Sequence, residues 1–326
     1  MKAFTQSRRR TASVKSRRNP PWSALLALVI CCTPVGDAFA TEGGGNSYPI
    51  GVDNTFAGYM LPEGAHWLLF YQHYTATQFK DNTGRDNPRF TDFRLQSDVV
   101  APRLSYVWPD VLVLGANVET RIVQPVSAVD LTLGIARPAP LAPLDHGGRH
   151  GGLSDLFFSP IILGWHGATF HQTLGVETNL STGSYDVHRY VNTGRNYDQV
   201  APAYAFTWFP TSRSDISAKF RWGFNDRNKA TGYHSGNEAS IEFSAGLRAT
   251  LEMLVGINGY IYRQTTDDGV NGVPVKGNKG RVNALGPFAS FRFSPNFSLT
   301  LRVQSEFGAR NRPQGTRFWA MALCPF

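Results

Sequence analysis

The segment Ile216-Ser217-Ala218-Lys219-Phe220-Arg221-Trp222-Gly223-Phe224-Asn225 alternates strictly between two kinds of side chain. One parity carries Ile, Ala, Phe, Trp and Phe, and the other carries Ser, Lys, Arg, Gly and Asn. Successive side chains of a strand point to opposite faces, so the pattern predicts a strand with an apolar face and a polar face. A length of about ten residues matches a tilted strand that crosses a bilayer.

The same alternation recurs along the chain, at 238–247, 297–304 and 111–119. Extended to the whole sequence, it predicts twelve strands, at 66–78, 92–108, 111–123, 153–165, 168–180, 198–209, 215–225, 237–248, 251–263, 283–293, 297–307 and 316–326. Short connections are expected at 109–110, 166–167, 210–214, 249–250 and 294–296. Long connections are expected at 79–91, 124–152, 181–197, 226–236, 264–282 and 308–315. Short and long connections that alternate are typical of an outer-membrane barrel, so the predicted fold is all-β, a transmembrane antiparallel β-barrel of twelve strands.

The first forty residues have the anatomy of a secretory signal peptide. A basic stretch is followed by an apolar core at 24–32 and by Ala38-Phe39-Ala40, a pattern at which signal peptides are cleaved. Cleavage after Ala40 would remove seven of the 32 basic residues, so most of the net charge of +8 belongs to the leader and nucleic-acid binding is not expected. It would also leave Cys324 as the single cysteine, which excludes an intramolecular disulfide.

The mature chain has the composition of a membrane barrel. Aromatic residues make up 13% and charged residues only 17%, and no run of eighteen apolar residues follows the leader. We therefore expect the bacterial outer membrane as the location and its lipids as partners. The chain ends in Phe326, and a terminal Phe on the last strand is expected to be recognised by the barrel assembly machinery, although Pro325 before it is atypical.

Residues 41–64 are rich in glycine and lack the alternation, so they are predicted to be a non-barrel arm before a barrel at 65–326. One interpretation is a plug inside the lumen, and the other is a loose periplasmic tail. The plug is favoured because Tyr48, Ile50 and Phe56 would be poorly placed in water.

Charged residues on the polar parity should face the lumen, because Lys or Arg facing lipid at mid-bilayer costs about 2–4 kcal/mol. The candidate luminal residues are Glu119, Lys219, Arg221, Glu238, Glu242, Arg302 and Glu306. A simple hairpin places Lys219 near Glu242. These charges would either form a constriction that selects solutes or brace the barrel wall as ion pairs. Tyr260 and Tyr262 are candidate aromatic residues of the lumen.

No other motif indicates chemistry. The eight histidines lack further ligands at metal-site spacing, and no G-x-S-x-G or nucleotide-binding motif supports catalysis, so no catalytic residue, metal site or cofactor is predicted. The Pro-rich segment 136–143 could fold over the mouth of the barrel or serve as a surface spacer.

The sequence resembles the "meta-pathway of phenol degradation" family of outer-membrane proteins over nearly all of 41–326. The resemblance rests on EGGGNSYPIG at 42–51, GYMLPEG at 58–64, GLSDL at 152–156, NTGRNY at 192–197 and SGNE at 235–238. The family more often has a second Gly where this chain has Ser154. The resemblance implies an outer-membrane barrel that passes hydrophobic or aromatic compounds, and it does not imply enzymatic activity.

We therefore expect a porin-like channel for the passive uptake of small hydrophobic or aromatic compounds. A structural or adhesion barrel with a closed lumen is the alternative, and a barrel hydrolase is a third hypothesis.

Overall fold

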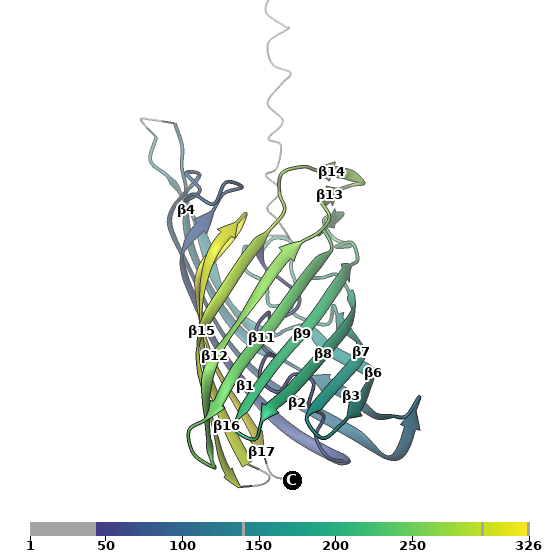
Figure 1. Ribbon diagram of the computed structural model, residues 1–326. Helices are drawn as coiled ribbons and strands as arrows, with labels where there is room; N and C mark the ends of the chain where they lie inside the picture. The colour runs from purple at the N-terminus through teal and green to yellow at the C-terminus, as the bar shows by residue number, and fades with distance from the viewer. Residues whose placement is uncertain (1–43, 139–140, 295–296, 325–326) are drawn as a thin grey trace, which may run out of the picture. The chain divides into compact units, whose positions relative to one another are not determined.

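The computed structural model describes residues 44–138, 141–294 and 297–324 (Figure 1). The predicted signal peptide and Phe326 lie outside the described residues. Within these ranges, no helix is long and apolar enough to cross a membrane.

Twelve strands close into an antiparallel barrel, as the alternation predicts. They are β1 (Gly64–Lys80), β2 (Phe90–Val113), β3 (Ala116–Val123), β6 (Leu156–His166), β7 (Phe170–Leu180), β8 (Gln199–Thr211), β9 (Ser214–Asn225), β11 (Glu238–Arg248), β12 (Met253–Gln264), β15 (Arg281–Ser294), β16 (Phe297–Arg310) and β17 (Arg312–Cys324). Because β1 is hydrogen-bonded to both β2 and β17, the barrel has no open edge.

The two ends of the barrel differ in their connections. Turns of two to four residues lie at the end where β17 also finishes, at the bottom of Figure 1; they are 114–115, 167–169, 212–213 and 249–252. We call this the short-turn end. The opposite, long-loop end carries 81–89, 181–198, 226–237 and 265–280. The last two loops contain a small sheet of β10 (Tyr233–His234), β13 (Asp268–Val270) and β14 (Val273–Val275). Outer-membrane barrels have short periplasmic turns, so the short-turn end corresponds to the periplasmic side.

The alternating segment 216–225, on β9, behaves as its pattern predicts. On β9 the rings of Phe220, Trp222 and Phe224 are exposed on the outside of the barrel, whereas Lys219 and Arg221 are buried inside it. Apolar side chains therefore face the lipid and polar side chains face the lumen.

The segment 124–152, predicted as a loop, contains two strands instead. β4 (Val126–Ile135) and β5 (Leu144–Leu153) form a hairpin, and β4 pairs with the outer half of β2. β3 pairs only with the half of β2 nearer the short-turn end, so without β4 the other half would have hydrogen-bond partners only on the edge that faces β1. Residues 129–135 do alternate, with Val129, Leu131, Leu133 and Ile135 on one parity, so β4 could have been found from the sequence, whereas the Gly- and His-rich 144–153 has no such pattern.

Two connections also differ from the prediction. The turn expected at 109–110 lies at 114–115, where Leu114 and Gly115 both have positive φ, as a two-residue hairpin turn needs. Asp110, also at positive φ, lies where the pairing of β2 with β3 shifts register, and the strand continues past it. The long loop expected at 308–315 is the single residue Asn311, whose φ of +52° permits a tight turn between β16 and β17.

Candidate functional site: a lumen occupied by the N-terminal arm

Residues 44–63, which we call the arm, run inside the barrel from the long-loop end to the short-turn end. Near the first end, the Asn46 amide donates to the Glu238 carboxylate, 2.9 Å away on the first residue of β11. Near the other end, the Gly58 backbone N–H donates to Thr207 Oγ1 on β8 at 3.1 Å. The chain then enters β1, so the arm follows the length of the lumen without joining the wall.

Asp53 lies at the middle of the arm and joins three cations of the barrel wall. Its carboxylate is 3.0 Å from Arg103 Nη1, 3.1 Å from Lys219 Nζ and 3.4 Å from Arg121 Nη1. A carboxylate removed from water is costly unless it is paired. Burial would raise the pKa of Asp53, but the three cations outweigh burial and hold that pKa well below its usual range. The arm is therefore anchored by an ionised carboxylate.

Lys219 and Arg221, two of the predicted luminal residues, share a second carboxylate, that of Glu177 on β7. Lys219 Nζ lies 2.6 Å from Glu177 Oε1, and Arg221 Nε donates to Oε2 at 2.9 Å. The Tyr48 ring of the arm packs against both cations, at 4.9 Å and 4.3 Å from its centroid. Lys219 is the register partner of Glu242, as expected from the sequence, yet its close ion pairs are with other carboxylates.

Two more of the predicted residues hold the backbone of the arm. The Asp53 N–H donates to Glu242 Oε2 at 2.9 Å, and Arg302 Nη1 donates to the Val52 carbonyl at 2.8 Å. Gly51 has a φ of +89°, and a Cβ at this position would lie 2.4 Å from the Gln304 amide. Only glycine fits here without strain, because both the backbone conformation and the wall exclude a side chain.

Tyr260 and Tyr262 lie fully buried beneath the arm. Their hydroxyls donate to two predicted luminal carboxylates, Glu306 at 2.5 Å and Glu238 at 2.9 Å. Both rings belong to an apolar cluster that includes Ile50 of the arm. The two tyrosines therefore contact the arm, rather than an open passage, in this conformation.

Four charged residues of the network were missed from the sequence: Asp53, Arg103, Arg121 and Glu177. Arg121 also donates to the predicted Glu119, at 3.0 Å. Arg103, Arg121 and Glu177 lie on the inward parity of their strands, so the alternation held the signal that would have found them. Asp53 could not be found in this way, because the side chains of the arm do not alternate between apolar and polar.

Little space remains beside the arm. A cavity of about 20 Å³ lies next to Asp53, between Ala57 of the arm and wall residues such as Ile162 and Ala205. This volume holds about one water molecule and is too small for an aromatic ring. At Asp53 the arm therefore leaves no room for an aromatic solute.

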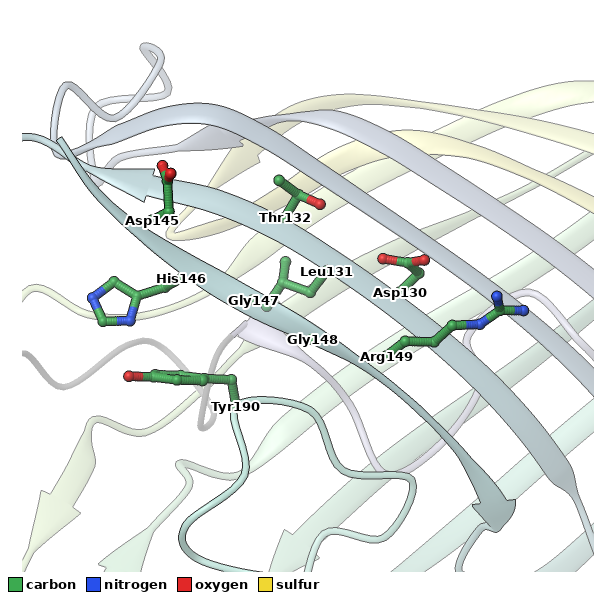
Figure 2. A pocket seen from close by; sticks show the side chains of 9 residues that line it. All are labelled: Asp130, Leu131, Thr132, Asp145, His146, Gly147, Gly148, Arg149 and Tyr190. Atoms are coloured by element: carbon green, nitrogen blue, oxygen red, sulfur yellow. The ribbon is translucent and has the colours of Figure 1, made fainter.

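A larger pocket, of about 530 Å³, opens at the long-loop end (Figure 2). Strands β4 and β5 and one residue of the loop after β7 line it: Asp130, Leu131, Thr132, Asp145, His146, Gly147, Gly148, Arg149 and Tyr190. The exposed Tyr190 packs edge-on against His146, with ring centroids 4.9 Å apart. His150 on β5 contacts Arg189 and Ser184, which ties that loop to the hairpin. We call this space the outer pocket.

Neither region is arranged as a metal centre. Across the part of the chain that the structure describes, no group of three or more His, Cys, Asp or Glu side chains is placed to hold a metal ion.

The family model described as "Putative MetA-pathway of phenol degradation" matches residues 76–322. The chain belongs to this family. None of the curated proteins compared with the chain matches it.

Solved structures with a similar fold are outer-membrane proteins. An outer-membrane channel from Pseudomonas putida F1 has a TM-score of 0.70 and 16% sequence identity, covering 82% of this chain and 98% of that chain. A FadL homologue from Pseudomonas aeruginosa has a TM-score of 0.42 and 9% identity, covering 89% and 100%. The CymD monoaromatic hydrocarbon channel has a TM-score of 0.40 and 10% identity, covering 89% and 99%. The first comparison shows a shared barrel fold, and the other two are too distant to add to it.

In this member of the phenol-degradation family, two of the glycine motifs meet at the long-loop end. Asp155 accepts hydrogen bonds from the backbone N–H groups of Gly183 and Arg195, at 2.9 Å and 2.8 Å. A Cβ on Gly183 would lie 2.7 Å from the Gly194 backbone, so the two loop segments touch. Burial raises the pKa of the Asp155 carboxyl. These motifs fix the shape of the outer mouth above the arm.

Proposed function

We propose that the protein is an outer-membrane channel for the passive uptake of small hydrophobic or aromatic compounds, and that the arm holds it closed. The observation that carries the proposal is the position of Asp53. A wall braced only for stability would pair its charges from strand to strand, but here Arg103 has its ion pair with a carboxylate on a separate segment. Withdrawal of that segment would open a passage without breaking the hydrogen-bonded wall.

Family membership supports the class of solute. The family is named for the degradation of phenol, and the outer pocket offers the exposed Tyr190 ring on the side where solutes arrive. In this proposal the signal peptide directs export, the barrel assembly machinery recognises Phe326, and solute moves down its gradient.

A hydrolase is disfavoured by the surroundings of a Ser–His contact at the outer mouth. Ser184 Oγ lies 3.0 Å from His150 Nε2, within reach of a nucleophile and its base. The same imidazole, however, is contacted by the Arg189 guanidinium. Hydrolytic triads orient and stabilise the base with a carboxylate, and a cation in that place opposes the imidazolium that must form. We therefore propose a protein that is not an enzyme.

A structural barrel is the second candidate, because the lumen beside Asp53 retains only about 20 Å³. Cells that carry the full chain in the outer membrane should take up labelled phenol several-fold faster than cells without it. Equal uptake by the two strains would favour the structural barrel. The comparison needs an intact outer leaflet, because phenol crosses a simple lipid bilayer unaided.

A further inference from the structure

The position of Asp53 is built as a carboxylate site. Its three cations come from three strands: Arg103 from β2, Arg121 from β3 and Lys219 from β9. β2 and β3 are neighbours in the wall, and three strands, β6, β7 and β8, separate β3 from β9 on the shorter way round, so the cations converge from two separate parts of the wall. Guanidinium and ammonium groups that converge on one point are suited to a planar carboxylate.

Arg103 needs the carboxylate most. Arg121 also pairs with Glu119, and Lys219 also pairs with Glu177. For Arg103, Asp53 is the carboxylate within ion-pair distance among the described residues, and its buried Nε has no hydrogen-bond partner. Movement of Asp53 away would leave a buried guanidinium without its counter-ion, which is strongly unfavourable. Another anion that entered at that moment would be bound there.

The surroundings of the site add a preference for an aromatic anion. The apolar part of the cavity next to Asp53 is formed by Ile162, Ala203 and Ala205 of the wall and by Ala57 of the arm, and its polar part includes Thr173 and Glu177, the latter paired with Lys219. The Arg103 guanidinium lies 5.0 Å from the centroid of the Phe70 ring. One side of the cavity beside the cations is therefore apolar, and the space would widen when Ala57 moves away with the arm. A carboxylate head with a flat apolar ring matches both parts, whereas a neutral phenol cannot replace the charge of Asp53.

We propose that the Asp53 position is a binding site for small aromatic carboxylates and that Asp53 is its tethered competitor. The inference rests on the proposed channel function and names the class of solute that would displace the arm. An incoming aromatic carboxylate takes over the ion pairs of Asp53 and so raises the open fraction of the channel, whereas a neutral solute such as phenol enters only when the arm withdraws unaided.

The test measures benzoate binding and not transport. A negative result can therefore be told apart from a failure of the channel proposal, which is tested by uptake. The full chain in detergent is titrated with benzoate in a calorimeter, as wild type and as Asp53→Asn. The Asn54 and Gly51 contacts of the arm remain in this variant. Benzoate should bind Asp53→Asn about ten-fold or more tightly than it binds wild type, because the competitor is neutral. The control variant, Asp86→Asn at an exposed carboxylate of the long-loop end, should bind benzoate like wild type.

Three outcomes would overturn the proposal. They are equal benzoate affinity in wild type and Asp53→Asn, benzamide binding as tight as benzoate binding, and acetate or chloride binding as tight as benzoate binding. A second variant keeps the test decisive if Asp53→Asn folds poorly. In Asp53→Asn/Arg103→Gln the unpaired cation is also removed, so the fold should recover and benzoate affinity should return to the wild-type level or below. Tight benzoate binding by this double variant would contradict the assignment of the site.

Discussion

The lumen around Asp53 and the outer pocket are opposite kinds of site. In the lumen, charged side chains from several strands and the arm are buried in ion pairs, and about 20 Å³ is left empty. The outer pocket has about 530 Å³, lies against a hairpin whose strand β5 is a sheet edge, and presents exposed side chains. Each buried luminal charge depends on its ion-pair partners, so a substitution there should be costly. A substitution in the outer pocket should change the free energy of unfolding only a little. The predictions below test this difference.

The largest effect is expected from Lys219→Met. The change leaves the carboxylates of Asp53 and Glu177 buried with one cation fewer, and removal of one partner from a buried ion pair costs about 3–5 kcal/mol. Urea unfolding in detergent micelles should show a loss of this size. The matched control is Lys229→Met, on an exposed loop residue, which should leave the unfolding midpoint unchanged. Equal midpoints for all three proteins would show that the luminal network is not a source of stability.

A smaller effect is expected from Gly51→Ala. The new Cβ meets Gln304 and Tyr260, and the residue must keep a positive φ, so docking of the arm should weaken by about 1–3 kcal/mol while the barrel stays folded. Proteolysis should then cleave the arm faster than in wild type. Gly148→Ala in the outer pocket is the control, because no atom lies within 4 Å of its added Cβ. Cleavage that is equally slow in both variants would contradict the tight fit at Gly51.

Tyr190→Ala should have a small effect on stability and a larger one on solute capture. The ring is exposed and touches one histidine, so the free energy of unfolding should change by about 0.5 kcal/mol or less. Uptake of labelled phenol at low concentration should fall, because an aromatic contact at the mouth is lost. Uptake equal to wild type at every concentration would remove the outer pocket from the pathway.

The smallest effect is expected from mild acid. The pKa of Asp53 is lowered in the docked arm relative to the free arm, so docking is stabilised above the free value of about 4 and lost as the pH falls through the lower, docked value. Conductance in planar bilayers should therefore stay constant from about pH 7.5 to pH 5 and rise only in stronger acid. A rise between pH 7 and pH 5 would mean that another titrating group controls the arm.

The barrel could be predicted from the sequence because lipid acts on every spanning strand in the same way. On β9, for example, Phe220 faces the lipid and Lys219 faces the lumen, so apolar and polar side chains alternate with a period of two residues. All seven predicted luminal charges are buried inside the barrel for the same reason. Strand β5 and the turn at Asn311 show no such period, so composition suggested a loop at each, where the chain forms a strand and a tight turn.

The contacts of the arm could not be predicted by this logic. Its residues pair with strands up to 266 positions away, as Asn46 does with Arg312, and no local pattern records such a partner. Glycine at 51 was visible in the sequence, but its reason, a positive φ against Gln304, appears only once the arm lies inside the barrel. The apolar residues of the arm favoured a plug over a tail, yet they did not reveal that Asp53 would meet three cations.

The central claim is that the arm closes the lumen, and a reversible covalent lock tests it most directly. The Asn54 amide lies 3.0 Å from the Asn258 side chain on β12, so Asn54→Cys/Asn258→Cys in a Cys324→Ser background places two thiols at the contact between arm and wall. Uptake of labelled phenol is measured in one preparation before and after reduction of the disulfide. The account predicts uptake at the level of cells without the protein while the lock is oxidised, and recovery after reduction. Uptake by the oxidised protein equal to that of the reduced protein would contradict closure by the arm.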